Sequence, residues 1–91
     1  MPSLPPMSER RDRSSGSFAR VLIVDDEPGL RQVLEIAFRR QGYDVVTAPG
    51  VRRAIEAVRQ NPQPFPLVLT DLVMPDGSGM QVLEEAKKKV Q

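Results

Sequence analysis

The 91-residue chain contains no histidine and no cysteine. Without cysteine it can form no disulfide, no thiolate nucleophile and no cysteine-based zinc site, and this composition fits a reducing compartment. Without histidine it cannot hold a Ser-His-Asp triad, a zinc motif of the H-E-x-x-H type or a phosphohistidine. The side chains that remain for chemistry at a site are mainly carboxylates.

An excess of charge of one sign and long apolar runs are also missing. The chain has 13 Lys and Arg residues against 12 Asp and Glu residues, so no overall field attracts nucleic acid or an anionic membrane. No stretch reaches the roughly 18 consecutive apolar residues of a membrane span, and the N-terminus lacks the apolar core of a signal peptide. We therefore expect a cytoplasmic protein that binds neither nucleic acid nor a membrane through this segment.

The chain divides into two parts by composition. Residues 1–18 are rich in Pro, Ser and Arg and show hardly any apolar periodicity, so they bury too little surface to offset the entropy lost on ordering. We expect a disordered leader there. Residues 19–91 leave room for one small domain.

Apolar residues in the second part alternate between strand and helix patterns. The run at 21–24 ("VLIV") is typical of a strand buried on both faces of a parallel sheet. The segment 43–48 ("YDVVTA") predicts a short second strand, and 67–70 ("LVLT") a third. Each strand is followed by an apolar stripe with helical spacing: Leu30, Val33, Leu34, Ala37 and Phe38; Val51, Ala54, Ile55 and Val58; Met80, Val82, Leu83, Ala86 and Val90. This βαβαβα order predicts an α/β fold with a parallel sheet and right-handed crossovers.

Acidic residues stand where two of these strands end. Asp25 and Asp26 follow the first strand, and Asp71 follows the third. Sites in parallel α/β sheets lie at the carboxyl ends of strands, so the strand order 2-1-3 of a flavodoxin-like fold would bring the three carboxylates together. Like charges at that range raise a pKa or demand a cation, and oxygen ligands with open water positions suit Mg²⁺. The acids therefore predict a magnesium site.

Two segments carry a resemblance to a known family: "VLIVDDEPGLRQVLEIAFRRQGYDV" and "PLVLTDLVMPDGSGMQVLEEAKK". Their acidic pair, lone acid and D-x-x-M-P-x-x-x-G loop come in the order found in the receiver domain of bacterial two-component response regulators. The resemblance runs from about Arg20 to the end of the chain. It implies a three-layer, flavodoxin-like fold.

The resemblance also implies roles for individual residues. Asp71 would accept a phosphoryl group, Asp26 would bind Mg²⁺ directly, and Asp25 would bind it through water or support a ligand. The backbone carbonyl of Val73 would be a further ligand. The loop after the acceptor would be shaped by residues that fix or free the backbone, namely Met74, Pro75, Gly77 and Gly79.

Partners follow from the same resemblance. The phosphodonor would be a sensor histidine kinase, because this chain has no histidine of its own. The second segment is similar to receivers of enhancer-binding transcription regulators, which implies a transcriptional output outside this chain. We expect only three of the family's five βα units, without the Ser or Thr after strand four and the Lys after strand five. The third strand would then present an open edge, favouring self-association, and the first helix would lack a packing neighbour.

Other interpretations stay open from the sequence. Asp25, Asp26 and Glu27 are also suited to capping the first helix, and Asp76 and Ser78 to a turn and a helix cap. A partial receiver could act only as a binding or decoy module. A carboxylate phosphatase would need an acid two residues after the nucleophile, where this chain has a valine, so we expect no enzyme.

Overall fold

The computed structural model describes residues 19–90, and the leader predicted for residues 1–18 lies outside them. Strands and helices alternate in the predicted order. In sequence they are β1 (Arg20–Val24), α2 (Pro28–Arg40), β2 (Asp44–Ala48), α3 (Val51–Gln60), β3 (Leu67–Thr70), β4 (Val73–Met74), β5 (Gly77–Ser78) and α4 (Gly79–Val90).

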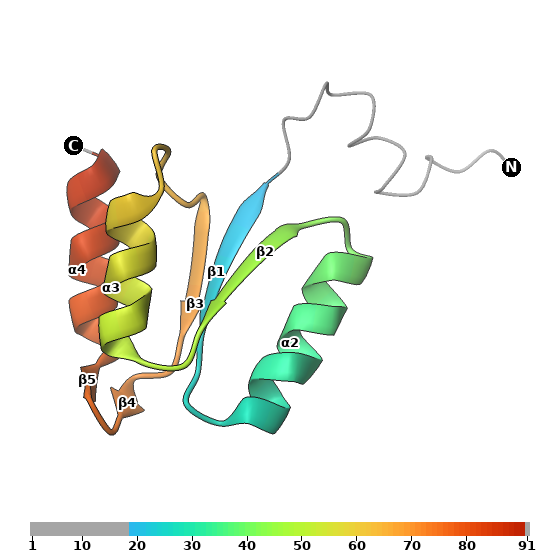
Figure 1. Ribbon diagram of the computed structural model, residues 1–91. Helices are drawn as coiled ribbons and strands as arrows, with labels where there is room; N and C mark the ends of the chain where they lie inside the picture. The colour runs from blue at the N-terminus through green and yellow to red at the C-terminus, as the bar shows by residue number, and fades with distance from the viewer. Residues whose placement is uncertain (1–18, 91) are drawn as a thin grey trace, which may run out of the picture.

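The three longer strands form a parallel sheet in the order β2-β1-β3. β1 lies in the centre, where Val21 pairs with Val45 on one side and with Leu67 on the other. α2 covers one face of the sheet, and α3 and α4 cover the opposite face (Figure 1). The predicted three-layer, flavodoxin-like α/β fold and its strand order are confirmed.

A small antiparallel hairpin follows the sheet. β4 pairs with β5 through Val73 with Ser78 and Met74 with Gly77, where the sequence indicated only a loop. The expectation missed these strands because two residues are too few to show a period of two.

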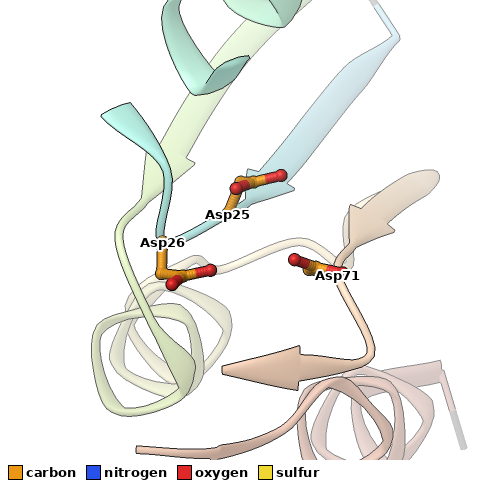
Figure 2. Close-up of side chains that lie close together, drawn as sticks. All are labelled: Asp25, Asp26 and Asp71. Carbon is orange, nitrogen blue, oxygen red and sulfur yellow. The ribbon is translucent and has the colours of Figure 1, made fainter. Parts of the chain in front are cut away.

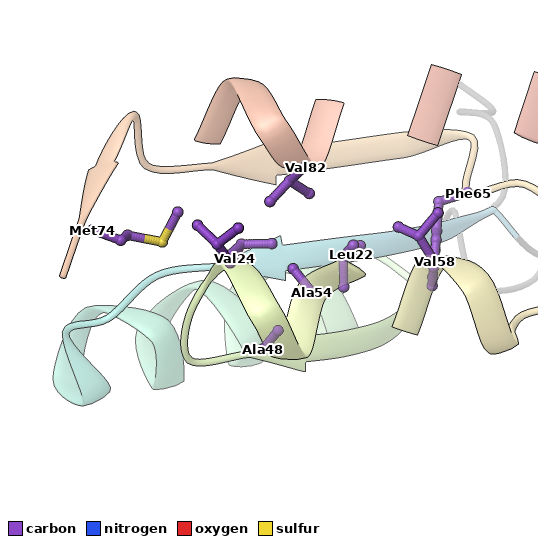
Figure 3. Close-up of a cluster of buried hydrophobic side chains, with 9 residues drawn as sticks. Leu22, Val24, Ala48, Ala54, Val58, Phe65, Met74 and Val82 are labelled. Atoms are coloured by element: carbon purple, nitrogen blue, oxygen red, sulfur yellow. The ribbon is translucent and has the colours of Figure 1, made fainter. Parts of the chain in front are cut away.

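The largest apolar cluster fills the space between the sheet and the two helices α3 and α4 (Figure 3). Alternate side chains of β1 point to opposite faces of the sheet, as the pleat of a strand requires. Leu22 and Val24 belong to the large cluster, whereas Val21 and Ile23 pack with Val45 on the α2 face. These four side chains are almost fully buried, so residues 21–24 of the central strand have no exposed face.

Two of the predicted apolar stripes are only partly buried. In α2, Leu34 packs against the sheet, but Leu30 and Val33 are 48% and 60% exposed. In α4, Val82 is fully buried, whereas Met80, predicted to be core, is 54% exposed. Periodicity identifies the apolar side of a helix, but it does not show how much of that side the neighbouring elements cover.

The outer edge of β3 is open within residues 19–90, as the sequence predicts. β3 pairs only with β1 in this part of the chain, and Leu67 and Leu69 are 38% and 37% exposed. Across residues 19–90, every helix is too short or too polar to span a bilayer.

Candidate functional site

The backbones of two acids extend the hydrogen-bond ladder of the sheet. Val24 and Thr70 form the last residue pair between β1 and β3, and Asp25 and Asp71 follow them directly. The amide of Asp71 donates to the carbonyl of Val24 at 3.1 Å, and the amide of Asp25 donates to the carbonyl of Ala48 at 3.2 Å. The sheet therefore fixes the backbones of both acids.

The side chains of Asp25, Asp26 and Asp71 converge on one space (Figure 2). One carboxylate oxygen from each lies within 4.8 Å of the others. Oxygens around an octahedral Mg²⁺ lie about 2.9 Å apart when adjacent and about 4.1 Å when opposite, as ligand distances of about 2.05 Å require. A small inward movement, or a water between one acid and the ion, would meet this geometry. The cluster therefore fits a small divalent cation.

The acids keep oxygens available for such an ion. Asp25 uses one oxygen to accept from the amide of Glu27 at 2.9 Å, and Asp71 uses one to accept from the amide of Leu72 at 3.0 Å. Within the described part of the chain, the carboxylate of Asp26 accepts no hydrogen bond. The cap of α2 comes instead from Glu27, whose carboxylate accepts from the amide of Gly29 at 2.7 Å.

The three acids differ in burial, and one positive charge lies near them. Asp25 is 6% exposed, whereas Asp26 and Asp71 are open to solvent. The guanidinium of Arg31 donates to the backbone carbonyl of Asp25 at 2.7 Å, which brings one positive charge beside the cluster. Of the two acids held by the sheet, only Asp71 is open to a large reactant.

The hairpin β4–β5 begins directly beside the acids. Val73 starts β4 two residues after Asp71, and its side chain is 80% exposed. The amide of Gly79 donates to the carbonyl of Leu72 at 2.9 Å. A Cβ atom on Gly79 would overlap the backbone carbonyl of Asp71, so this close approach requires glycine.

The remaining loop residues have different surroundings. Met74 is buried in the core, and Pro75 lies at the surface, where it lines a hollow with Asp26. Gly77 has a φ of +148°, which side chains rarely allow. Ser78 caps α4 as predicted, since its hydroxyl accepts from the amide of Met80 at 3.1 Å.

Asp76 has a role that sequence reasoning missed. Predicted as a turn residue, it accepts from the amides of Val51 at 2.9 Å and Arg52 at 3.0 Å, at the start of α3. The amides of Arg52 and Val51 hold the pKa of Asp76 below its usual value. The one signal in the sequence was Gly50, a helix N-cap that has no side chain with which to cap.

Comparison with known proteins defines the class to which this fold and site belong. Residues 21–91 match the family model of the response regulator receiver domain. The chain therefore belongs to the family of response regulator receiver domains.

Individual relatives agree with this family. The chain is 40% identical over 70 residues to the response regulator protein PilR of Pseudomonas aeruginosa, which covers 77% of this chain and 15% of PilR. It is 37% identical over 78 residues to the probable transcriptional regulatory protein TcrX of Mycobacterium tuberculosis, covering 85% of this chain and 32% of TcrX. The chain thus spans less than a third of the length of either relative.

Solved structures show the same fold. A response regulator receiver domain protein from Clostridium thermocellum superposes with a TM-score of 0.72 at 32% sequence identity, covering 78% of this chain and 56% of that one. The non-phosphorylated HemR receiver domain from Leptospira biflexa gives a TM-score of 0.68 at 36% identity, covering 77% and 55%.

Proposed function

We propose that this chain is a receiver module in which Asp71 accepts a phosphoryl group from the phosphohistidine of a sensor histidine kinase. Mg²⁺ would be held by Asp25, Asp26, Asp71 and the backbone carbonyl of Val73. The observation that carries the proposal is the convergence of three carboxylates, within 4.8 Å, at the ends of two paired strands.

The surroundings of Asp71 suit a nucleophile. One of its oxygens accepts from the amide of Leu72, which orients the carboxylate. That oxygen has a second lone pair for Mg²⁺, and the other oxygen is left to attack phosphorus. The new oxygen–phosphorus bond forms as the phosphorus–nitrogen bond of the donor breaks, and the electron pair of that bond stays on the imidazole. A bound Mg²⁺ supplies positive charge that offsets the negative charge of the phosphoryl oxygens.

Accessibility favours Asp71 over Asp25 as the acceptor. The donor is a side chain of another protein, and Asp25 is 6% exposed, which keeps it from a donor of that size. Asp71 is exposed at the end of a strand whose backbone is fixed by the sheet. A fixed and open carboxylate needs little reorganisation to reach the donor.

Two other functions are less well supported. A carboxylate phosphatase would need an acid or base two residues after Asp71, and Val73 has no titratable group there. A binding or decoy module would keep the fold but would not accept a phosphoryl group. The same proposal includes a transcriptional output, which regulatory names such as that of TcrX favour. It also includes a cytoplasmic location and no contact of this segment with nucleic acid or a membrane.

The test is a titration of the 91-residue chain with Mg²⁺, followed by NMR of the backbone amides. A beryllium fluoride mimic of the phosphoryl group is then added. We expect Mg²⁺ to shift the amides around Asp25, Asp26 and Asp71, and the mimic to add shifts that Asp71→Asn lacks. Asp44→Asn is the matched control, because Asp44 lies at the opposite end of the sheet, paired with Arg20.

Each outcome separates the candidates. A folded chain with no response to Mg²⁺ would refute the proposal. A response to Mg²⁺ without any response to the mimic would favour the decoy function. Equal responses in Asp71→Asn and the unmodified chain would show that Asp71 is not the acceptor.

A further inference from the structure

The N-terminus of α3 is capped from a distant part of the chain. Gly50 occupies the N-cap position and makes no side-chain hydrogen bond. Asp76, 25 residues after Val51, supplies the missing acceptor, with one carboxylate oxygen on the amide of Val51 and the other on the amide of Arg52. N-caps normally come from the residue that begins the helix. Here the cap joins the β4–β5 hairpin to α3.

The approach between these two segments is close. A Cβ atom on Gly50 would lie 2.9 Å and 3.0 Å from the two carboxylate oxygens of Asp76. Gly50 has an extended backbone, with φ at −172°, so any residue could adopt its conformation. Space beside Asp76, and not backbone freedom, is what glycine provides at this position.

The same contact borders the acidic site. Asp26 and Asp76 line one hollow of about 380 Å³, together with Pro75 and Arg52. In Figure 2, the arrow of β4 leads from the turn after Asp71 toward the side where Asp26 lies. The hydrogen bond from Gly79 to Leu72 holds the hairpin at its base, and Asp76 holds it at its tip.

We propose that Asp76 is a positioning residue for the metal site. By fastening the hairpin to α3, it keeps the main chain of Val73 beside Asp26 and Asp71. This inference rests on the proposed function, because it takes the carbonyl of Val73 as a ligand. If the tip were released, only a fraction of molecules would hold that carbonyl in place, and the apparent affinity would fall by that fraction.

The experiment measures the Mg²⁺ affinity of the 91-residue chain and of four variants by amide NMR. Asp76→Ala removes the cap, and Gly50→Ala displaces the carboxylate while keeping every charge. We expect both to bind Mg²⁺ more weakly, by up to about five- to tenfold, the full factor that a typical N-cap contributes to the equilibrium between the fastened and released hairpin. Asp76→Asn keeps an acceptor oxygen and should lose less than Asp76→Ala. Ser78→Ala, which removes the cap of α4 from the same hairpin, should stay within about twofold of the original affinity.

Hydrogen exchange shows that the intended contact has been changed. The amides of Val51 and Arg52 should exchange faster in Asp76→Ala and Gly50→Ala, while those of β1 stay protected. This readout also identifies any variant that has unfolded. If Asp76→Ala unfolds, Gly50→Ala and Asp76→Asn still decide the question.

Three results would overturn the inference, and they differ from failure of the proposed function. Unchanged Mg²⁺ affinity in both Asp76→Ala and Gly50→Ala would exclude positioning. Weaker binding in Asp76→Ala and Asp76→Asn alike, with Gly50→Ala unchanged, would show that only the charge of Asp76 matters. An equal loss in Ser78→Ala would mean that any weakening of the hairpin suffices. Absence of Mg²⁺ binding in the unmodified chain would refute the proposed function itself.

Discussion

Replacing Gly79 with alanine should destabilise the protein strongly. The added Cβ would overlap the carbonyl oxygen of Asp71 and would lie 2.9 Å from the hydroxyl of Thr70. That hydroxyl donates to the same carbonyl at 2.9 Å, and the backbone of Asp71 is fixed to β1. The backbone carbonyl of Asp71 cannot rotate away, so the start of α4 must move.

The magnitude follows from three contributions. Overpacking at a fixed backbone costs about 1–3 kcal/mol, and the weakened bond from Gly79 to Leu72 costs about 1 kcal/mol. The better helix propensity of alanine returns about 0.5–1 kcal/mol. We expect a net loss of about 1–3.5 kcal/mol, which lowers the midpoint of thermal unfolding by roughly 4–28 °C for a domain of this size.

The assay is thermal and urea unfolding followed by circular dichroism, with Gly29→Ala as the matched control. Gly29 also lies in the first turn of a helix, but its added Cβ would meet only the carboxylate end of Glu27 at 3.2 Å. The control should change the free energy of unfolding by less than about 1 kcal/mol. If Gly79→Ala were no less stable than Gly29→Ala, the close packing argued for this loop would be wrong.

Two further predictions concern acid and the open edge. The pKa of Asp76 is lowered by the amides of Arg52 and Val51, and that of Glu85 by Arg59. Because both acids have lower pKa values in the folded state, their contribution to stability is present above about pH 4 and is lost as the pH falls below it. The double variant Asp76→Asn, Glu85→Gln should therefore be less stable at pH 7 and should lose less stability between pH 4 and 2.5; equal pH dependence would contradict this. The open edge of β3 should allow concentration-dependent self-association, which sedimentation should show weakened by Leu69→Lys but not by Val90→Lys, at a 71% exposed position; an unmodified chain that stays monomeric at every concentration would contradict it.

The strands and the acids at their ends were readable because each is encoded locally. "VLIV" is apolar at every position, which is typical of a strand buried on both faces, and β1 is buried in that way. The acids next to it and next to "LVLT" meet once the strand order is 2-1-3. Local patterns together with one topological rule were therefore enough for this part.

The contacts that could not be predicted from the sequence are those between segments distant in the chain. Asp76 caps a helix that begins 25 residues earlier, and nothing near Asp76 marks it as a cap. Met80 lies on an apolar stripe of α4, yet it is half exposed, because a stripe does not reveal what packs against it. Tertiary neighbours decide both cases, and a single sequence does not contain them in readable form.

The pairing of β1 with β3 has a consequence for folding. Val21 and Leu67 are 46 residues apart, so this pairing closes a long loop. The chain loses the conformational entropy of that loop before the contact can stabilise it. Asp25 and Asp71 become neighbours only when that loop has closed. An ion that needs both acids would thus bind the native state and neither the unfolded chain nor a form that contains only the first βαβ unit. Such an ion at a hundred times its dissociation constant would add about 2.7 kcal/mol to the free energy of unfolding, which couples the stability of the receiver to the supply of its cation.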